Sequence, residues 1–441
     1  MSKEKQPPIG RVIIPYGRSL MSLVAAHSLA RRNVEVIGCD DVDFTVLSFS
    51  RYTSHNFVHA NHDEEPEKFL DDMEKYIRKY KPEDDRPYIL MPMFRETVLL
   101  AENKDRFEGL IDVAAPDGSS ISKVSPKHVL VDTAREAGAA IPETRQPKDL
   151  DDFASMLDDI PLPAVIKPVD GVGGRGISFC KTKEELDKGY RKLAEKERIM
   201  PLIQEAVDGS DYCMTGLFQD GELQAHMAYT NLQTFPKDSG AGVMRETVED
   251  DLFAEEVKKL MKPTGWTGVA EIDFRWTGKK EDKPKLIEVN PRFWAGLFQS
   301  VDSGIDYPWL LYQMTATGKV PEHEEAEIGH KTRVPAFWAA EAFIEAFDEE
   351  KDFSRVSAAW RKVKSTFSDH QYKDTVKYLG ALFSEVTNLD DAAFVLKDRF
   401  HSAHEAESEL RLKKDPMTSL GVFYVVGSLI RHGKLPPEIK G

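Results

Sequence analysis

The first forty residues alternate between short β-branched runs and a helical pattern, and this alternation restricts the fold more than any other feature. RVIIPY (11–16) predicts a strand, GRSLMSLVAAHSLARR (17–32) a helix and VEVIGCD (34–40) a second strand. Two strands joined by a crossover helix form a β-α-β unit and lie parallel. The alternation continues with helical 65–80, strand-like 87–93 and helical 95–107. We therefore expect residues 1–118 to form an open α/β domain. Its first loop, GRSL, lacks the G-x-G-x-x-G dinucleotide motif.

Composition excludes several classes of protein. The chain has 441 residues, a length that predicts two or three domains. Its formal net charge is −16 and no cluster of Lys and Arg stands out, which argues against nucleic acid as a partner. The longest apolar run, LGVFYVVGSLI (420–430), is shorter than the roughly 20 residues that cross a bilayer and predicts a buried helix. No signal peptide is visible, and Cys39, Cys180 and Cys213 lack the spacing of disulfide frameworks or zinc sites. We expect a cytoplasmic, reduced protein that does not enter membranes.

A glycine-rich loop follows a strand in the middle of the chain. In AVIKPVDGVGGRGISF (164–179), Lys167 ends an apolar run, and Gly171, Gly173, Gly174 and Gly176 follow. Glycine lets backbone N–H groups converge on an anion, and phosphate is the expected guest. The loop is not a Walker motif, because no Gly-Lys-Ser/Thr ends it. A linker or simple hairpin is the alternative, but a linker has no need of a lysine placed to meet a phosphate.

Helix and turn signals organise the region around this loop. A helix is expected to end at Gly138, helices at 149–159 and 183–196 flank the strands on either side of the loop, and Asp220-Gly221 predicts a hairpin turn. From about Arg333 the pattern becomes helical. No internal repeat is visible.

Two later strands carry paired acidic and amide side chains. Residues two apart in a strand share a face, so Glu271 with Asp273, and Glu288 with Asn290, each present oxygen atoms on one side. If the two strands form a hairpin, these side chains cluster, and such hard oxygen ligands suit Mg²⁺. Arg292 could then bind a carboxylate or a developing oxyanion. An exposed polar face of an amphipathic hairpin is the alternative.

The pattern K-P-x-x-G-x-G-G-x-G, followed some hundred residues later by I-E-V-N-P-R, resembles the ATP-grasp superfamily. D-alanine–D-alanine ligase, biotin carboxylase and the large subunit of carbamoyl phosphate synthase belong to this superfamily, and the resemblance covers about residues 10–310. It implies an α/β ATP-grasp fold in four parts. These are an N-terminal α/β domain (1–118), a small subdomain with the glycine-rich loop (119–206), a large subdomain with the metal site (207–330) and a helical C-terminal region (331–441).

The resemblance also implies roles for individual residues. Lys127 and Lys167 would bind the nucleotide phosphates, and Gly171 to Gly176 would form a mobile phosphate lid. Glu205, Ala206 and Val207 would form the hinge that reads adenine, and Asp211 would bind the ribose. Asp273, Glu288 and Asn290 would bind the metal, which leaves Glu271 secondary, and Arg292 would face the acyl phosphate. Arg245 is the candidate for a substrate carboxylate or the γ-phosphate. Lys237 and His226 are weaker candidates, and for His226 an ordinary strand hydrogen bond is favoured.

The implied activity is that of an ATP-dependent, ADP-forming carboxylate–amine ligase, with Mg²⁺ as cofactor and Mn²⁺ as the alternative ion. A small-molecule carboxylate and an amine would be the substrates, and a homodimer is left open. Two alternatives remain. One is phosphorylation of bicarbonate as in carboxylases, disfavoured because carbamoyl phosphate synthase duplicates its core and this chain has no repeat. The other is a nucleotide-binding regulatory protein without turnover, disfavoured by the joint presence of the expected phosphate, metal and oxyanion residues.

Overall fold

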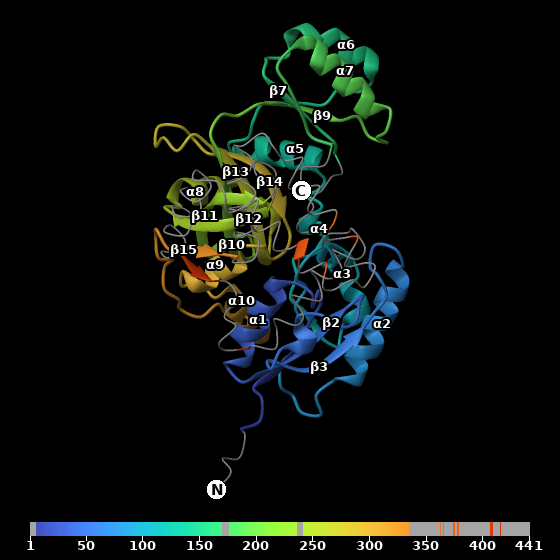
Figure 1. The fold of residues 1–441 in the computed structure, drawn as a ribbon, viewed down its shortest axis with the longest axis vertical. Coiled ribbons are helices and arrows are strands. Elements are labelled where there is room, and N and C mark those ends of the chain that lie inside the picture. Colours follow the sequence, from blue (N-terminus) through green and yellow to red (C-terminus); the bar gives the residue numbers. More distant parts are fainter. Residues whose placement is uncertain are drawn as a thin grey trace. The chain divides into compact units, whose positions relative to one another are not determined.

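The N-terminal residues form a parallel sheet, as predicted. The computed structural model describes residues 6–169, 176–235 and 241–334, together with the isolated positions 362, 365, 374, 377, 378, 406–408 and 415. Its first sheet has the strand order β3-β2-β1-β4-β5, and all neighbouring pairs in it are parallel. The elements are β1 Gly10–Ile14, α1 Leu20–Ala30, β2 Val34–Asp40, β3 Thr53–Val58, α2 Pro66–Lys79, β4 Tyr88–Leu90, α3 Glu96–Glu102, β5 Asp112–Val113 and α4 Gly118–Ile121 (Figure 1).

Helices cover both faces of this sheet. Val12 and Ile14 of β1 belong to one apolar cluster with α1, whereas Ile13 between them belongs to a second cluster with α2. Alternation along the strand thus gives each face its own core. Helix α1 begins after Ser19, whose side chain accepts a hydrogen bond from the Met21 N–H. Strand order reverses between β1 and β4, and in open α/β sheets ligands bind at the carboxyl ends of strands on either side of such a point.

A small antiparallel sheet carries the residues that flank the glycine-rich loop. Its order is β6-β9-β7-β8, and Lys167 is the last residue of β7, as predicted. The core of this lobe contains Phe153 and Tyr190, whose rings stack at 4.1 Å. Helix α5 ends at Gly138, which adopts φ 69° as the left-handed cap that the sequence predicts. The elements are α5 Lys127–Ala137, β6 Thr144–Arg145, α6 Leu150–Met156, β7 Ala164–Lys167, β8 Ser178–Cys180, α7 Lys183–Ala194 and β9 Leu202–Glu205.

A larger sheet carries the acidic residues. The order of its strands is β14-β13-β10-β11-β12, and the pairs β14·β13, β13·β10 and β10·β11 are antiparallel. Asp220 and Gly221 form the predicted hairpin turn with φ values of 52° and 83°. The elements are β10 Ser210–Gln219, β11 Glu222–Phe235, β12 Ala241–Val248, α8 Asp251–Met261, β13 Gly268–Trp276, β14 Lys285–Asn290, α9 Leu297–Asp302 and α10 Tyr307–Thr317.

The described residues divide into two compact units. Those in 6–231, 245–330 and residue 415 belong to the first, and those in 232–244 and 331–410 belong to the second. In the second unit β15 (Lys331–Arg333) pairs in parallel with β16 (Glu407–Ser408). Of the C-terminal region expected to be helical from residue 331, the structure describes residues 331–334, where β15 is a strand, and the isolated positions; the run at 420–430 lies outside the described residues.

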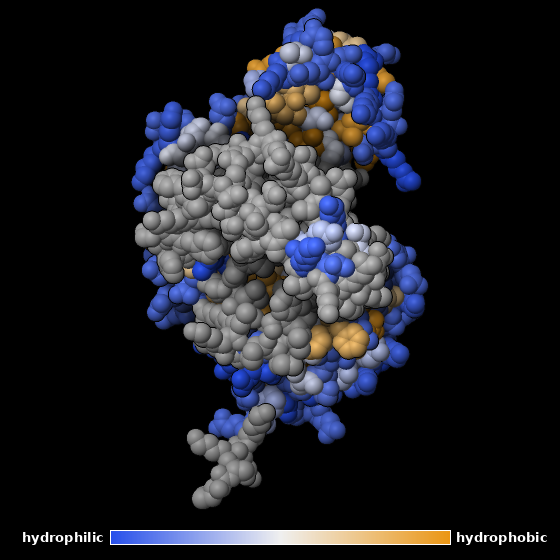
Figure 2. Space-filling view, in the orientation of Figure 1, coloured by the Kyte–Doolittle hydropathy of each residue, from blue (hydrophilic) through white to orange (hydrophobic). Residues whose placement is uncertain are grey.

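The surface of the small lobe is partly apolar. Figure 2 shows orange residues on this lobe, and its exposed large apolar side chains include Ile177, Phe179 and Ile199. Among the described residues, no helix is long and apolar enough to cross a membrane. Cys39, Cys180 and Cys213 are free cysteines with buried side chains.

Candidate active site

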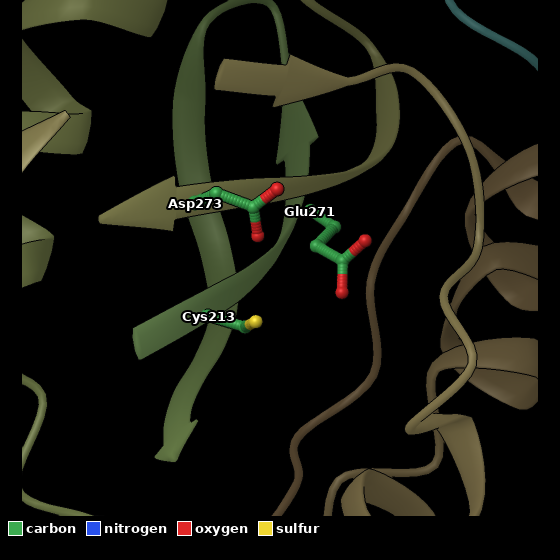
Figure 3. Close-up of side chains that lie close together, drawn as sticks. All are labelled: Cys213, Glu271 and Asp273. Atoms are coloured by element: carbon green, nitrogen blue, oxygen red, sulfur yellow. The ribbon is translucent and has the colours of Figure 1, made fainter. Parts of the chain in front are cut away.

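The strand register places the acidic side chains in rows across the large sheet. Asp273 on β13 lies opposite Glu288 on β14 and opposite Cys213 on β10. Two residues earlier, Glu271 lies opposite Asn290. The hairpin that the sequence predicts therefore forms, and its four polar side chains come together on one face. Figure 3 shows Glu271, Asp273 and Cys213 directed toward the same space from neighbouring strands.

This cluster has the electrostatics of a cation site. One ligand atom from each of Cys213, Glu271 and Asp273 lies within 4.8 Å of the others. The pKa of Asp273 is raised well above its usual range, first by burial and then by the negative charges of Glu271 and Glu288. Burial, followed by the negative charges of Asp273 and Glu271, also raises the pKa of the Cys213 thiol, which disfavours a thiolate beside these carboxylates. The oxygens that remain are ligands for a hard divalent cation.

Arg292 is held at the edge of this cluster. Its Nη1 lies 3.2 Å from Glu271 Oε2 and donates to the carbonyl of Phe293 at 2.8 Å, and its Nη2 donates to Asn290 Oδ1 at 3.2 Å. Asn290 in turn donates to Asp273 Oδ2 at 3.1 Å. Arg292 and the carboxylates thus form one hydrogen-bonded network.

Lys167 is a buried cation with a neutral partner. The residue is 7% exposed, its ammonium donates to Gln204 Oε1 at 2.5 Å, and Gln204 donates onward to Thr144. Burial lowers the pKa of Lys167 to about 8, while the charge of Glu288 acts in the opposite direction. Within the described part of the chain, Lys167 has no ion pair. A buried ammonium that lacks a carboxylate partner favours an anionic ligand.

Lys127 lies close to the same groups. It is the first residue of α5, and its Nζ forms an ion pair of 3.1 Å with Glu288 Oε1. The pKa of Lys167 also responds to the charges of Lys127, Asp211 and Arg275. The two predicted phosphate-binding lysines, the predicted ribose ligand and a predicted metal ligand are therefore within electrostatic range of one another.

A cavity of about 490 Å³ lies beside these residues. Lys127, Glu288, Asn290 and Arg292 line it, whereas Lys167, Asp273, the predicted hinge and Arg245 do not. The remaining lining residues include four from the N-terminal domain, which are Asp63, Phe94, Arg95 and Val98. Loop and helix residues that follow strands β3 and β4 of the N-terminal sheet thus line a cavity together with the predicted metal and oxyanion groups.

The predicted hinge is held by internal contacts. The Glu205 carboxylate pairs with Lys285 at 2.7 Å, so its side chain is engaged within the protein. The Ala206 N–H donates to the carbonyl of Pro163 at 3.2 Å, and the Val207 carbonyl accepts from Arg275 at 3.2 Å. Arg275 also pairs with the exposed carboxylate of Asp211 at 2.7 Å. Adenine binding here would have to use backbone groups that these contacts leave available, and Asp211 would have to leave Arg275 to bind a ribose.

The other predicted residues are placed as follows. Arg245 on β12 is 2% exposed and lies within electrostatic range of Tyr229. Burial raises the pKa of Tyr229, and the positive charge of Arg245 partly offsets this increase. His226 lies 2.6 Å from Asp250, which agrees with the ordinary hydrogen bond favoured for it. Gly176 adopts φ 78°. Gly171, Gly173, Gly174 and Lys237 lie outside the described residues.

Sequence reasoning missed the partners that hold these groups. Gln204, Arg275, Lys285 and Phe94 were not singled out, and Phe94 lies between the predicted strand 87–93 and the predicted helix 95–107. Gln204 carries a detectable signal, because it is a polar residue inside the apolar strand LIQE. Glu271 was ranked as secondary to Asp273, and the structure shows it buried at 7% exposure with Arg292 and Tyr229 as partners.

Known proteins share this architecture. Residues 124–296 match the family model described as ATP-grasp domain. An uncharacterised protein of Sinorhizobium fredii is 29% identical over 236 residues, which are 50% of this chain and 45% of that protein. Biotin carboxylase 1 of Bacillus subtilis is 24% identical over 281 residues, covering 58% of this chain and 59% of the relative.

A solved structure supports the same fold. The biotin carboxylase complex from Campylobacter jejuni superposes with a TM-score of 0.59 at 15% identity, covering 73% of this chain and 74% of that one. The chain spans about half the length of these curated relatives. The fold expectation is thus confirmed for the described residues, and residues 124–296 match an ATP-grasp domain.

Proposed function

We propose that this protein is an ADP-forming ligase that activates a small-molecule carboxylate with ATP and joins it to an amine. The proposal rests on two buried charged groups of opposite sign near one cavity. Among the described residues, Lys167 is a buried ammonium without a carboxylate ion pair, and Asp273 is a buried carboxylate crowded by two others. An anion would satisfy the first and a divalent cation the second, and a nucleoside triphosphate with its Mg²⁺ supplies both.

The residues fit this ligand pair. Asp273, Glu288 and Asn290 supply the oxygen donors that Mg²⁺ prefers, and Lys127 and Lys167 supply cations for phosphate oxygens. When bound, the metal would neutralise charge that develops on the transferred phosphoryl group. The hinge at Glu205 to Val207, Asp211 and the glycines of 171–176 remain the proposed adenine, ribose and phosphate contacts.

The proposed reaction has two steps. A carboxylate oxygen attacks the γ-phosphorus of ATP, ADP leaves, and an acyl phosphate forms, so that the protein contributes mainly positioning and charge. The amine then attacks the acyl carbon, loses a proton and expels phosphate. Arg292 lines the cavity with its guanidinium held by Glu271 and Asn290, and it would stabilise the oxyanion of the second step. Arg245 is a further proposed anion-binding group.

A carboxylase-type reaction is the second candidate. The similarity to a biotin carboxylase over 58% of this chain favours it. In that reaction bicarbonate takes the place of the carboxylate, so the same lysines, acids and Arg292 would serve. The two candidates differ in the substrate that raises ADP release.

The experiment is acyl phosphate trapping. The full chain is incubated with ATP, Mg²⁺, hydroxylamine and single carboxylates from a metabolite panel, and hydroxamates are identified by mass. In parallel, ADP release and transfer of label from [¹⁴C]bicarbonate to biotin are measured. We expect one carboxylate to give a hydroxamate together with ADP.

Matched variants sharpen this test. Lys167→Ala should abolish the hydroxamate, whereas Lys188→Ala, at an exposed position on α7 of the same lobe, should leave it unchanged. Labelled biotin without any hydroxamate would select the carboxylase reaction. ATP binding without ADP release on any substrate would refute both reactions and leave a nucleotide-binding regulatory protein.

A further inference from the structure

The guanidinium of Arg292 is held from two sides by residues that belong to different parts of the fold. On one side, Glu271 of β13 lies 3.2 Å from Nη1. On the other, the ring of Phe94 lies against the guanidinium, whose carbon is 4.9 Å from the ring centroid. Phe94 belongs to the N-terminal domain, in the segment between β4 and α3.

The side of Glu271 is rigid. Its carboxylate accepts a hydrogen bond from the Tyr229 hydroxyl at 2.9 Å, and both residues are buried. Burial, together with the negative charge of Glu271, raises the pKa of Tyr229 well above its usual range, so the hydroxyl remains a donor. A Cβ at Gly296 would approach the Tyr229 hydroxyl to 2.9 Å, so glycine there leaves room for this contact. Glu271 therefore has little freedom to turn away from Arg292.

The side of Phe94 is equally constrained. The buried Glu96 carboxylate accepts from the backbone N–H groups of Met93 at 2.8 Å and of Phe94 at 3.0 Å, which fixes the segment that presents the ring. Phe94 also stacks on Tyr16, with centroids 5.0 Å apart and ring planes 9° apart.

Tyr16 has an uncommon backbone conformation. Its φ of 58° lies in the left-handed region, which bulky residues seldom occupy. The carbonyl of Tyr16 accepts a hydrogen bond from the Ser22 hydroxyl at 2.8 Å and another from the Ser19 N–H at 3.0 Å, and these contacts maintain the conformation. Strain of this kind persists where the surrounding structure imposes it, and such positions cluster at functional sites.

We propose that Phe94 and Glu271 are positioning residues that fix Arg292 in the candidate active site, so that the N-terminal domain supplies one wall of the site. This inference rests on the proposed function for the role of Arg292. Neither residue contacts a reacting atom in this scheme. Phe94 sets the position of the guanidinium through its ring face, and Glu271 sets it through hydrogen bonding and charge.

The first test needs no substrate. Phenylglyoxal modifies accessible arginines, and the modification rate of the peptide that contains Arg292 is measured by mass spectrometry. We expect Phe94→Leu and Glu271→Gln each to raise this rate several-fold, because each releases one side of the guanidinium. Glu256→Gln is the matched control, since Glu256 is also buried and paired with a cation, Lys259 at 2.6 Å, but is not a partner of Arg292.

The second test is a double-mutant cycle on activity. Phe94→Leu should lower kcat/KM for the carboxylate by about tenfold, the scale of one cation–π contact, with KM for ATP unchanged. Combined with Arg292→Lys, it should add little further loss, because both changes remove the same interaction. Tyr229→Phe serves where Glu271→Gln fails to fold, and it should give a smaller effect of the same kind.

The outcomes separate the two proposals. Unchanged Arg292 modification in both single variants, or losses that multiply fully in the double variant, would overturn the positioning role. The positioning role would stand and the ligase would be refuted if Arg292 is modified faster in the two single variants while the wild-type protein never releases ADP.

Discussion

Replacing Lys167 with methionine tests whether this residue lowers stability for the sake of ligand binding. Lys167 is 7% exposed, and burial lowers its pKa from an ordinary 10.5 to about 8. This difference corresponds to about 3 kcal/mol of unfavourable free energy in the folded state when the lysine is charged. The substitution keeps an unbranched apolar chain but leaves the buried Gln204 oxygen without its donor, at a cost of about 1 kcal/mol. We expect a net gain of about 2 kcal/mol at pH 7.

The sign of the pH dependence follows from the direction of the pKa change. Below pH 8 the lysine is charged in both the folded and the unfolded chain, so the full destabilisation is present. Between pH 8 and pH 10.5 the unfolded chain binds more protons than the folded one, and the stability of the wild type rises with pH. Above pH 10.5 the lysine is neutral in both states. The advantage of Lys167→Met should therefore disappear there.

The assay is urea unfolding followed by circular dichroism at pH 7 and pH 10.5, without nucleotide. Lys188→Met, at an exposed position of the same lobe, serves as the control and should differ little from the wild type at both pH values. In a parallel measurement, ATP with Mg²⁺ should stabilise the wild type but not Lys167→Met. A Lys167→Met protein that is less stable than the wild type by the same amount at both pH values would refute the argument from desolvation.

Three further predictions concern the metal cluster and two glycines. Asp273→Asn should weaken Mn²⁺ binding, measured by electron paramagnetic resonance, by about tenfold or more, because it removes a carboxylate ligand. Cys213→Ala should leave that affinity within about twofold, because the protonated thiol offers the ion little; a large loss would instead make sulfur a ligand. Gly209→Ala should prevent correct folding, since its Cβ would lie 2.0 Å from the Trp276 carbonyl oxygen. Gly138→Ala, whose Cβ would have no atom within 4 Å, should lower the free energy of unfolding by only about 1 kcal/mol, as measured by thermal unfolding.

Elements whose determinants lie within a short segment could be predicted from the sequence. The turn at Asp220-Gly221 and the helix end at Gly138 depend on local backbone conformation, and both are confirmed. The pairing of Asp273 with Glu288 followed from side-chain alternation in two strands of one hairpin. Strand β3, Thr53–Val58, was missed because its sequence TSHNFV is mostly polar, and it forms an edge of the sheet.

Contacts between distant segments could not be predicted in the same way. Phe94 and Arg292 are separated by most of the chain, and only the folded arrangement of the N-terminal and ATP-grasp parts brings the ring to the guanidinium. Glu205 looked like a hinge residue, but its side chain is engaged by Lys285, eighty positions later. Such pairs are set by tertiary packing, which a local pattern does not encode.

The ion pair between Lys127 and Glu288 couples the two ligands of the proposed site. One partner is the proposed phosphate cation and the other the proposed metal ligand, and they are 3.1 Å apart. A metal that takes Glu288 frees the ammonium for phosphate, and a phosphate that takes Lys127 frees the carboxylate for metal. Each ligand therefore removes a competitor of the other, and thermodynamic reciprocity makes the gain in affinity the same in both directions. The apparent dissociation constant for nucleotide should fall as free Mg²⁺ rises, even before the direct attraction between the two ligands is counted.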